Sequence, residues 1–227
     1  MEKYFKFLDD FCQYDYSHCA KDHKSRAYTF QFIWDEMIKL EKPVIIELGT
    51  TRSFVHGGHE GCMCFDKQYW FPNNPEVWDW SAGCFTRVFA EMPDKEFHTV
   101  DISKDHIWIA ETITEEFNGM HYHVQDSIDY LNSFSKQSDL IYMDTGDMNP
   151  IEVTAKLHLR EAEIIVNLER VKIGGYILMD DVRNPVPVQQ FGEKSCFGKD
   201  KISIGYFLAN GFDIIMDEYQ MILKRMR

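Results

Sequence analysis

Carboxylate side chains lie at or just after the ends of five short apolar segments of the chain. They are Glu47, Asp101, Asp126, Asp144 and the adjacent pair Asp180 and Asp181. A carboxylate only accepts hydrogen bonds, so it can bind hydroxyl or amino groups of a ligand, and it also binds hard cations such as Mg²⁺. The carboxyl ends of parallel strands meet at one edge of a sheet, where ligands of α/β proteins bind. The pattern therefore predicts a ligand site built from acids at that edge.

The elements that would hold these acids alternate between strands and helices. Apolar, β-branched runs predict strands at 44–48, 97–101, 121–126, 139–144 and 176–181, and two more strands follow near the end of the chain. Helical spacing of apolar residues predicts helices at 26–40, 81–92, 103–117, 128–134, 151–170 and 200–209. This order predicts an α/β fold: a Rossmann-like, mostly parallel seven-stranded sheet with helices on both faces and an antiparallel C-terminal edge hairpin.

The 227 residues suit a single domain, 1–227. Residues 1–42 are predicted to form an N-terminal helical cap or lid, in which 14–23 either covers a cofactor or makes homodimer contacts. Residues 55–79 are predicted to be a loop insertion, and 182–199 a gate over the acceptor. The insertion contains His56, His59, Cys62 and Cys64. These four residues could bind zinc, although the neighbouring glycines equally suit a loop that contacts substrate.

Individual roles follow from position and chemistry. Gly49 allows a tight turn against a ligand, and Asp101 is placed to accept both hydroxyls of a ribose. Asp126 could accept a hydrogen bond from an adenine amino group, and Glu47 could hold a ligand's ammonium. Each acid also has a structural alternative, because a carboxylate after a strand commonly caps the next helix.

The segments IIELGTTRS, TVDIS, VQDS, LIYMD and GGYILMDD resemble the successive motifs of class I S-adenosylmethionine-dependent methyltransferases, over about residues 43–223. The resemblance implies S-adenosylmethionine as cofactor. It implies a cofactor site made of Glu47, Gly49, Thr50, Thr51, Ser53, Asp101, Ile102, Asp126, Ser127 and Asp144. One departure is that Gly49 is followed by Thr50, Thr51 and Arg52 rather than by the further glycines of the family.

Within that family the acids resemble those of catechol O-methyltransferase and of Mg-dependent sugar O-methyltransferases. The resemblance implies that Asp144, Asp180 and Asp181 hold Mg²⁺, which would lower the pKa of an acceptor hydroxyl. The alternative is a set of solvated acids at the rim. Asp147 is the candidate general base and His158 a weaker one, whereas catechol O-methyltransferase has a lysine near the Asp147 position.

Charge and composition bear on partners. Lys and Arg total 24 against 37 for Asp and Glu, a net charge of -13, which repels a phosphate backbone, so nucleic acid is not an expected partner. We expect no membrane partner, because no apolar run is long enough to span a bilayer. With no export signal, the six cysteines are expected to be reduced and the protein cytoplasmic.

The sequence therefore predicts a Mg²⁺-assisted O-methyltransferase of a small hydroxylated acceptor, such as a sugar or a secondary metabolite. The alternatives are a metal-independent enzyme or an N-methyltransferase, and a non-catalytic partner subunit that binds the cofactor. A nicotinamide oxidoreductase is disfavoured, because Thr50-Thr51-Arg52 does not fit the pattern G-x-G-x-x-G.

Overall fold

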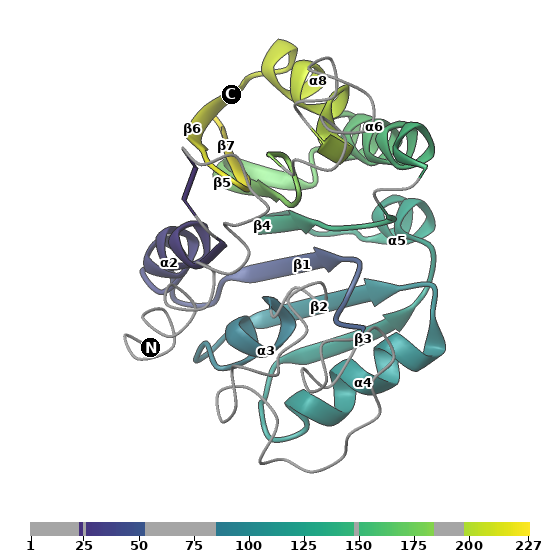
Figure 1. Ribbon diagram of the computed structural model, residues 1–227. Coiled ribbons are helices and arrows are strands. Elements are labelled where there is room, and N and C mark those ends of the chain that lie inside the picture. Colours follow the sequence, from purple (N-terminus) through teal and green to yellow (C-terminus); the bar gives the residue numbers. More distant parts are fainter. Residues whose placement is uncertain (1–22, 25, 53–84, 148–149, 184–197) are drawn as a thin grey trace.

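The computed structural model describes residues 23–24, 26–52, 85–147, 150–183 and 198–227. Its centre is one seven-stranded sheet with the strand order β3-β2-β1-β4-β5-β7-β6 (Figure 1). The strands are β1 Val44–Leu48, β2 Glu96–Asp101, β3 Met120–Val124, β4 Ser138–Met143, β5 Val171–Met179, β6 Phe212–Asp217 and β7 Met221–Arg225. The pairs among β1 to β5 are parallel, while β7 is antiparallel to both β5 and β6. The predicted fold class is confirmed.

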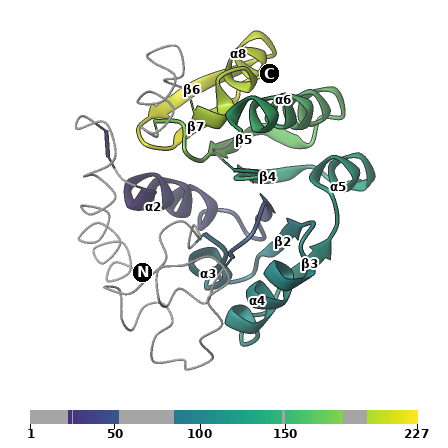
Figure 2. The same ribbon diagram turned by 45° about the vertical axis from the view of Figure 1, so that its right-hand side comes forward.

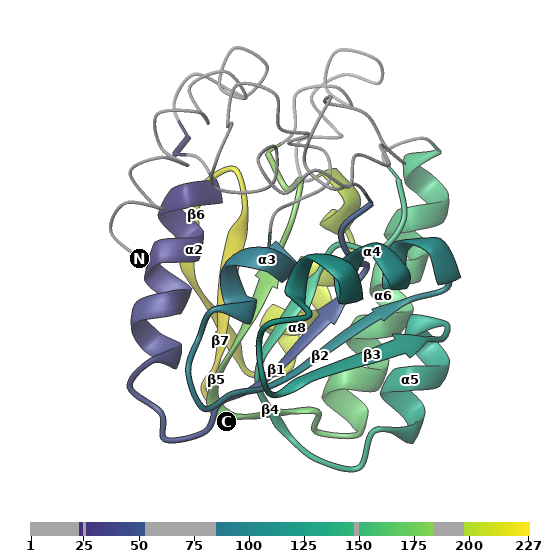
Figure 3. The same cartoon turned by 90° about the horizontal axis from the view of Figure 1, so that it is seen from below.

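Helices cover both faces of this sheet. On one face lie α2 Arg26–Met37, α3 Phe85–Ala90 and α4 Lys104–Thr114, which Figure 3 shows together on the near side of the strands. On the other face lie α5 Ser127–Ser133, α6 Ile151–Asn167 and α8 Ser203–Ala209 (Figure 2). No helix of the described ranges is long and apolar enough to cross a membrane.

The two hydrophobic cores arise from the alternation of side chains along each strand. Ile45 of β1 packs with α2 and α3, whereas its neighbours Ile46 and Leu48 pack with the residues of α5, α6 and α8. A cluster of aromatic rings from Phe30, Phe85 and Tyr142 joins the first set of helices to the sheet. A strand that is apolar on both faces therefore has a helix on each side, as its sequence predicts.

Strand β5 differs from its predicted bounds at both ends. The pair Gly174 and Gly175 precedes the predicted strand 176–181 but lies inside the observed one, where the pairing with β4 shifts register and Gly174 has φ +85°. A glycine in such a bulge keeps the strand continuous. At the other end β5 stops at Met179, so Asp180 and Asp181 follow the strand instead of belonging to it.

Candidate active site

The turn after β1 depends on glycine. Gly49 has φ +82°, and its N–H donates to the carbonyl of Val100 at 2.9 Å. A Cβ atom built on Gly49 would lie 2.5 Å from the carbonyl oxygen of Asp144. The turns that follow β1 and β4 therefore touch backbone to backbone, and this contact brings the residues after the two strands together.

Replacing Gly49 with alanine is expected to lower the free energy of unfolding by about 1 to 3 kcal/mol, because alanine is strained at this φ and its methyl group overlaps the Asp144 carbonyl. Urea denaturation measures the change. Gly205→Ala is the matched control, because a Cβ at Gly205 in α8 has no atom within 4 Å and alanine favours the helix. Equal stability of the two variants would contradict the backbone contact described above.

Glu47 lies beneath this turn and is only 2% exposed. Its carboxylate accepts hydrogen bonds from the hydroxyls of Thr86 at 2.9 Å and Thr99 at 2.5 Å, and Thr50 lies at 3.4 Å. Burial raises the pKa of Glu47 to about 8, although the threonine hydroxyls oppose the shift. The carboxyl group thus supports the turn from below; its predicted contact with a ligand's ammonium stays a prediction.

Asp101 stands at the end of β2, next to the Gly49 turn. One carboxylate oxygen accepts from the N–H of Ser103 at 2.7 Å, and the other lies 3.3 Å from the N–H of Thr50. Ser103, not Asp101, caps α4. These bonds fix the carboxylate at the carboxyl edge of the sheet, beside Ile102, whose side chain is 74% exposed. Gly49, Thr50, Asp101 and Ile102 therefore lie together at this edge, and their contact with a cofactor stays a prediction.

The other predicted cofactor residues are spread more widely. Thr51 is buried beside the Thr86 hydroxyl, and Ser53 lies outside the described residues. Asp126 caps α5 by accepting from the N–H groups of Ile128 and Asp129. The hydroxyl of Ser127 is buried and donates to Glu161 at 2.5 Å, so it turns away from the open edge.

Asp144, Asp180 and Asp181, here called the acid triad, converge after β4 and β5. One carboxylate oxygen of each lies within 4.8 Å of the others. Two cations stand among them. The Nζ atom of Lys199 is 2.6 Å from Asp144 and 3.3 Å from Asp181.

Arg26 supplies the second cation. Its guanidinium donates hydrogen bonds to Asp180 from Nε at 2.9 Å and from Nη2 at 2.8 Å, and Nη2 also donates to Asp181 at 3.2 Å. Gln220 donates to the same Asp180 at 2.7 Å. Both oxygens of the buried Asp180 are engaged by Arg26 or Gln220, while Lys199 holds Asp144 and Asp181. As placed, the triad therefore does not fit a divalent cation unless Lys199 withdraws and Arg26 releases an oxygen of Asp180.

The electrostatics of the triad follow from this pairing. Burial raises the pKa of Asp144 to about 7, against the opposing effect of the Lys199 ammonium. Burial also disfavours the ammonium of Lys199, but the surrounding carboxylates outweigh that effect and hold the pKa of Lys199 above its ordinary value. Lys199 is therefore a permanent cation, while Asp144 is poised to exchange a proton near neutral pH.

His158 does not reach this edge, which corrects its prediction as an alternative base. It is fully buried in α6; Nδ1 lies 2.7 Å from Asp200 and Nε2 lies 2.9 Å from the carbonyl of Thr145. With an acceptor at each nitrogen, the ring is held as an imidazolium. Its role is to pin the short 3₁₀ helix η5 Gly198–Asp200, and so to position Lys199.

The charge of His158 is expected to make stability depend on pH. Burial alone lowers the pKa of His158, but the Asp200 carboxylate outweighs it and raises the pKa to about 9. The folded state thus binds the proton more tightly than the unfolded state, whose histidine has a pKa of about 6.5. The stabilisation is fully present below about pH 6.5 and is lost as the pH rises through about 9.

Urea unfolding of the wild type and of His158→Gln between pH 6 and pH 10 measures this effect. The difference in free energy of unfolding between them should shrink by ~3 kcal/mol across that range. Lys95, whose pKa burial lowers to about 8, titrates in both proteins and cancels in the difference. If the difference in free energy of unfolding stays constant with pH, the His158 ring is neutral in the folded protein and not an imidazolium.

Asp147, the predicted base, lies on the exposed side of the site. Its side chain is 71% exposed, and it pairs with Arg52 at 2.9 Å.

Lys199 and Arg26, the two cations of the site, were not predicted from the sequence. The predicted zinc ligands His56, His59, Cys62 and Cys64, residues 1–22 of the predicted cap and residues 184–197 of the predicted gate lie outside the described residues. The rest of the cap contains α2, which packs against the sheet.

No protein-family model matches the chain, and no curated protein matches it in sequence. Solved structures do match in shape. An rRNA methylase from Streptococcus thermophilus matches with a TM-score of 0.51 and 9% identity, over 92% of this chain and 100% of that one. A putative O-methyltransferase from Klebsiella pneumoniae matches with a TM-score of 0.50 and 13% identity, over 97% and 90%. The N-methyltransferase NodS from Bradyrhizobium japonicum, in complex with S-adenosyl-L-homocysteine, gives 0.48 and 13%, over 96% and 100%.

The first of these matches corrects the prediction that nucleic acid is not a partner. A protein described as an rRNA methylase shares this fold over its whole length, so the fold is compatible with an RNA substrate. The exclusion rested on the net charge of -13, which averages over the entire surface and does not describe any one site. Net charge therefore does not decide the class of acceptor.

Proposed function

Since the chain has the fold of class I S-adenosylmethionine-dependent methyltransferases, we propose that it transfers a methyl group from S-adenosylmethionine to an acceptor hydroxyl without the help of a divalent cation. The observation that carries this proposal is the Lys199 ammonium, which stands between Asp144 and Asp181. A fixed cation at this point does what a metal ion would otherwise do for the acceptor oxygen.

The cofactor half of the proposed site is the edge formed by Gly49, Thr50 and Asp101. The carboxylate of Asp101 would accept the two ribose hydroxyls, as acids at the end of the second strand do in dinucleotide-binding sheets. Its orientation is already set by the N–H groups of Ser103 and Thr50, so little ordering is required when the ligand binds. Exposed Ile102 would offer an apolar surface to the adenine ring.

The acceptor half is the acid triad with Lys199. In the reaction the acceptor oxygen forms a bond to the methyl carbon while the bond from that carbon to sulfur breaks, and S-adenosylhomocysteine leaves. The hydroxyl proton passes to Asp144, whose pKa of about 7 suits a general base. The Lys199 ammonium stabilises the negative charge that develops on the oxygen. Asp147 stays a second candidate base.

The metal-assisted form of this reaction is the second candidate, because the three carboxylates lie within 4.8 Å of one another. Asp144, Asp180 and Asp181 would hold Mg²⁺, which would act as a Lewis acid on the acceptor hydroxyl. This form requires Lys199 to leave the triad and Arg26 to release an oxygen of Asp180. We propose a small hydroxylated molecule, such as a sugar, as the acceptor in either case.

Removal of metal separates the two forms. Purified protein, first shown to bind S-adenosylhomocysteine by calorimetry, is assayed with S-adenosylmethionine and a panel of sugars, catechols, amines and RNA, with EDTA or with Mg²⁺. We expect transfer to a hydroxyl at the same rate in both conditions. Loss of activity in EDTA with recovery in Mg²⁺ would select the metal-assisted form. Methylation of amines alone would overturn O-methylation, and absence of binding would overturn both forms.

A further inference from the structure

Four side chains with imidazole or carboxylate groups share one face of β2 and β3. Glu96 and His98 alternate along β2, and His121 and His123 along β3, with His98 and His121 paired in register. They lie on the face covered by α5, and Glu96, His98 and His121 lie in the starting halves of the two strands, whereas the acid triad follows the far ends of β4 and β5. This group, here called the histidine cluster, has no part in the proposed methyl transfer.

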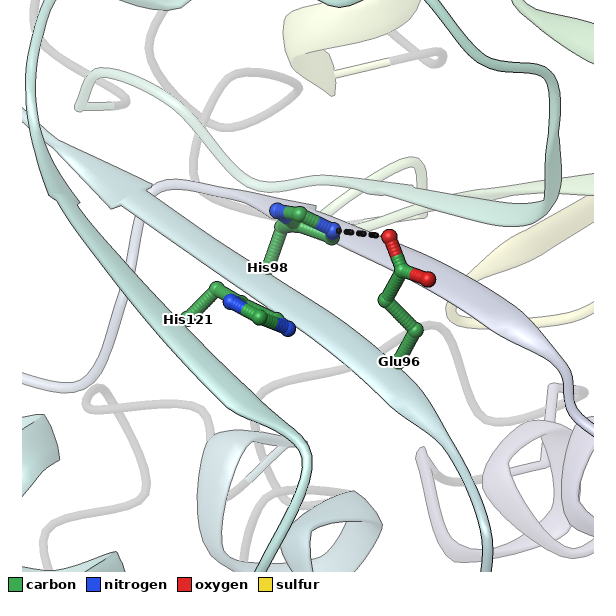
Figure 4. Close-up of side chains that lie close together, drawn as sticks. All are labelled: Glu96, His98 and His121. Atoms are coloured by element: carbon green, nitrogen blue, oxygen red, sulfur yellow. Dashed lines mark hydrogen bonds and ion pairs between the residues drawn. The ribbon is translucent and has the colours of Figure 1, made fainter.

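Three members of the histidine cluster point toward one another, as Figure 4 shows. One ligand atom each of Glu96, His98 and His121 lies within 4.8 Å of the others. Nε2 of His98 is 3.0 Å from a Glu96 oxygen, and the rings of His98 and His121 stack with centroids 4.6 Å apart. Metal bonds of about 2.0 to 2.2 Å place tetrahedral ligand atoms roughly 3.5 Å apart, so small side-chain rotations would bring the three into range.

His98 is also supported as a metal ligand would be. Its second nitrogen, Nδ1, lies 3.1 Å from Nε2 of His123, which can accept a hydrogen bond from the Nδ1–H group when Nε2 of His98 binds a metal. The rings of Tyr130 and Phe134 pack against His98 and bury it, whereas the neighbouring His121 is exposed. The histidine cluster is therefore bordered by aromatic side chains at His98 and accessible to water at His121.

We propose that Glu96, His98 and His121 bind one divalent transition-metal ion, in the first place Zn²⁺, with water completing its coordination. Two imidazoles and one carboxylate suit zinc, whereas Mg²⁺ prefers oxygen ligands throughout. The ion would tie the edge strand β3 to β2. One cation competes for the site, because Nζ of Lys136 lies 2.5 Å from Glu96, but the lysine side chain is 58% exposed and is able to turn into solvent.

Titration of the full chain with Co²⁺, a spectroscopic substitute for Zn²⁺, tests the proposal. We expect one equivalent of Co²⁺ to bind at the histidine cluster and to produce the visible absorption bands of tetrahedral cobalt. Addition of Zn²⁺ should displace the Co²⁺ and abolish these bands. His121→Ala removes an exposed ligand without opening the core, and should weaken binding by more than about 100-fold, while His123→Ala should weaken it by roughly 10- to 100-fold. Lys136→Met should strengthen binding, because Glu96 loses its competing partner.

Two controls exclude other sites. Cys62→Ser with Cys64→Ser removes the thiols of the 55–79 segment, and Asp181→Asn alters the acid triad; both variants should bind cobalt as the wild type does. The proposal is overturned if the wild type binds no Co²⁺ or Zn²⁺ at about 100 μM metal, a concentration at which a three-ligand site should be occupied. It is equally overturned if His121→Ala binds normally, or if the bands vanish with the two cysteines.

Discussion

Replacing Lys199 with alanine is expected to lower the rate of methyl transfer about 100- to 1,000-fold, the usual cost of losing one preorganised group that stabilises developing negative charge. The affinity for S-adenosylhomocysteine should change little, because Lys199 contacts Asp144 and Asp181 and not the Gly49 turn or Asp101. Lys199→Arg keeps the charge and should retain part of the rate. Transfer assays with saturating cofactor, together with calorimetry, measure both quantities.

Stability must be separated from catalysis here, because removal of Lys199 leaves buried carboxylates without a counter-ion. The double variant Asp144→Asn with Lys199→Met removes one charge of each sign and should recover stability without recovering activity. Lys201→Ala is the matched control from the same segment, since Lys201 pairs with Glu152, whose side chain is 67% exposed, and not with a member of the acid triad among the described contacts. Full activity in a folded Lys199→Ala protein would refute the role of the ammonium.

Replacing Asp101 with alanine is expected to weaken binding of S-adenosylhomocysteine by at least about 100-fold, because two hydrogen bonds from ribose to a charged group are lost. Asp101→Asn should fall between the two proteins, since an amide still accepts one of the bonds. Calorimetric titration measures the dissociation constants directly.

Asp105→Ala is the control for that experiment. Asp105 lies four residues further on, in the first turn of α4, and its side chain is exposed. It should bind the cofactor like the wild type. If Asp101→Ala also does so, the carboxylate does not hold the ribose, and the cofactor site has to be sought elsewhere on the sheet.

The sequence was most informative where short apolar runs are bounded by residues that interrupt strands. Residues 44–48 lie between Pro43 and Gly49, and β1 occupies this range without deviation. Parallel topology then carries Asp101, Asp144 and Asp180 to a common edge, whatever their separation along the chain. The edge and its acids were therefore predictable from local patterns alone.

Lys199 and Arg26 were not predictable in the same way, because Asp144 lies 55 residues from Lys199 along the chain and Asp180 lies 154 residues from Arg26. Nothing in the residues around a single lysine indicates that it is buried among carboxylates. His158 did leave a signal. It shares a helical stripe with Thr154, Ala155, Glu161 and Ala162, all of which are buried, so the periodicity of α6 already pointed it into the core.

Asp180 accepts hydrogen bonds both from Arg26, near the beginning of the described residues, and from Gln220, which immediately precedes β7. During synthesis, residues 26 to 181 leave the ribosome well before β7, and until then β5 lacks the neighbour that separates it from β6. Until β7 is present, Asp180 therefore lacks its hydrogen bond from Gln220, and β5 is an unpaired edge strand of the sheet. Such an open edge favours association with chaperones or with other chains. In a chain that folds as it is synthesised, the surroundings of Asp180 are therefore completed only once β7 has emerged.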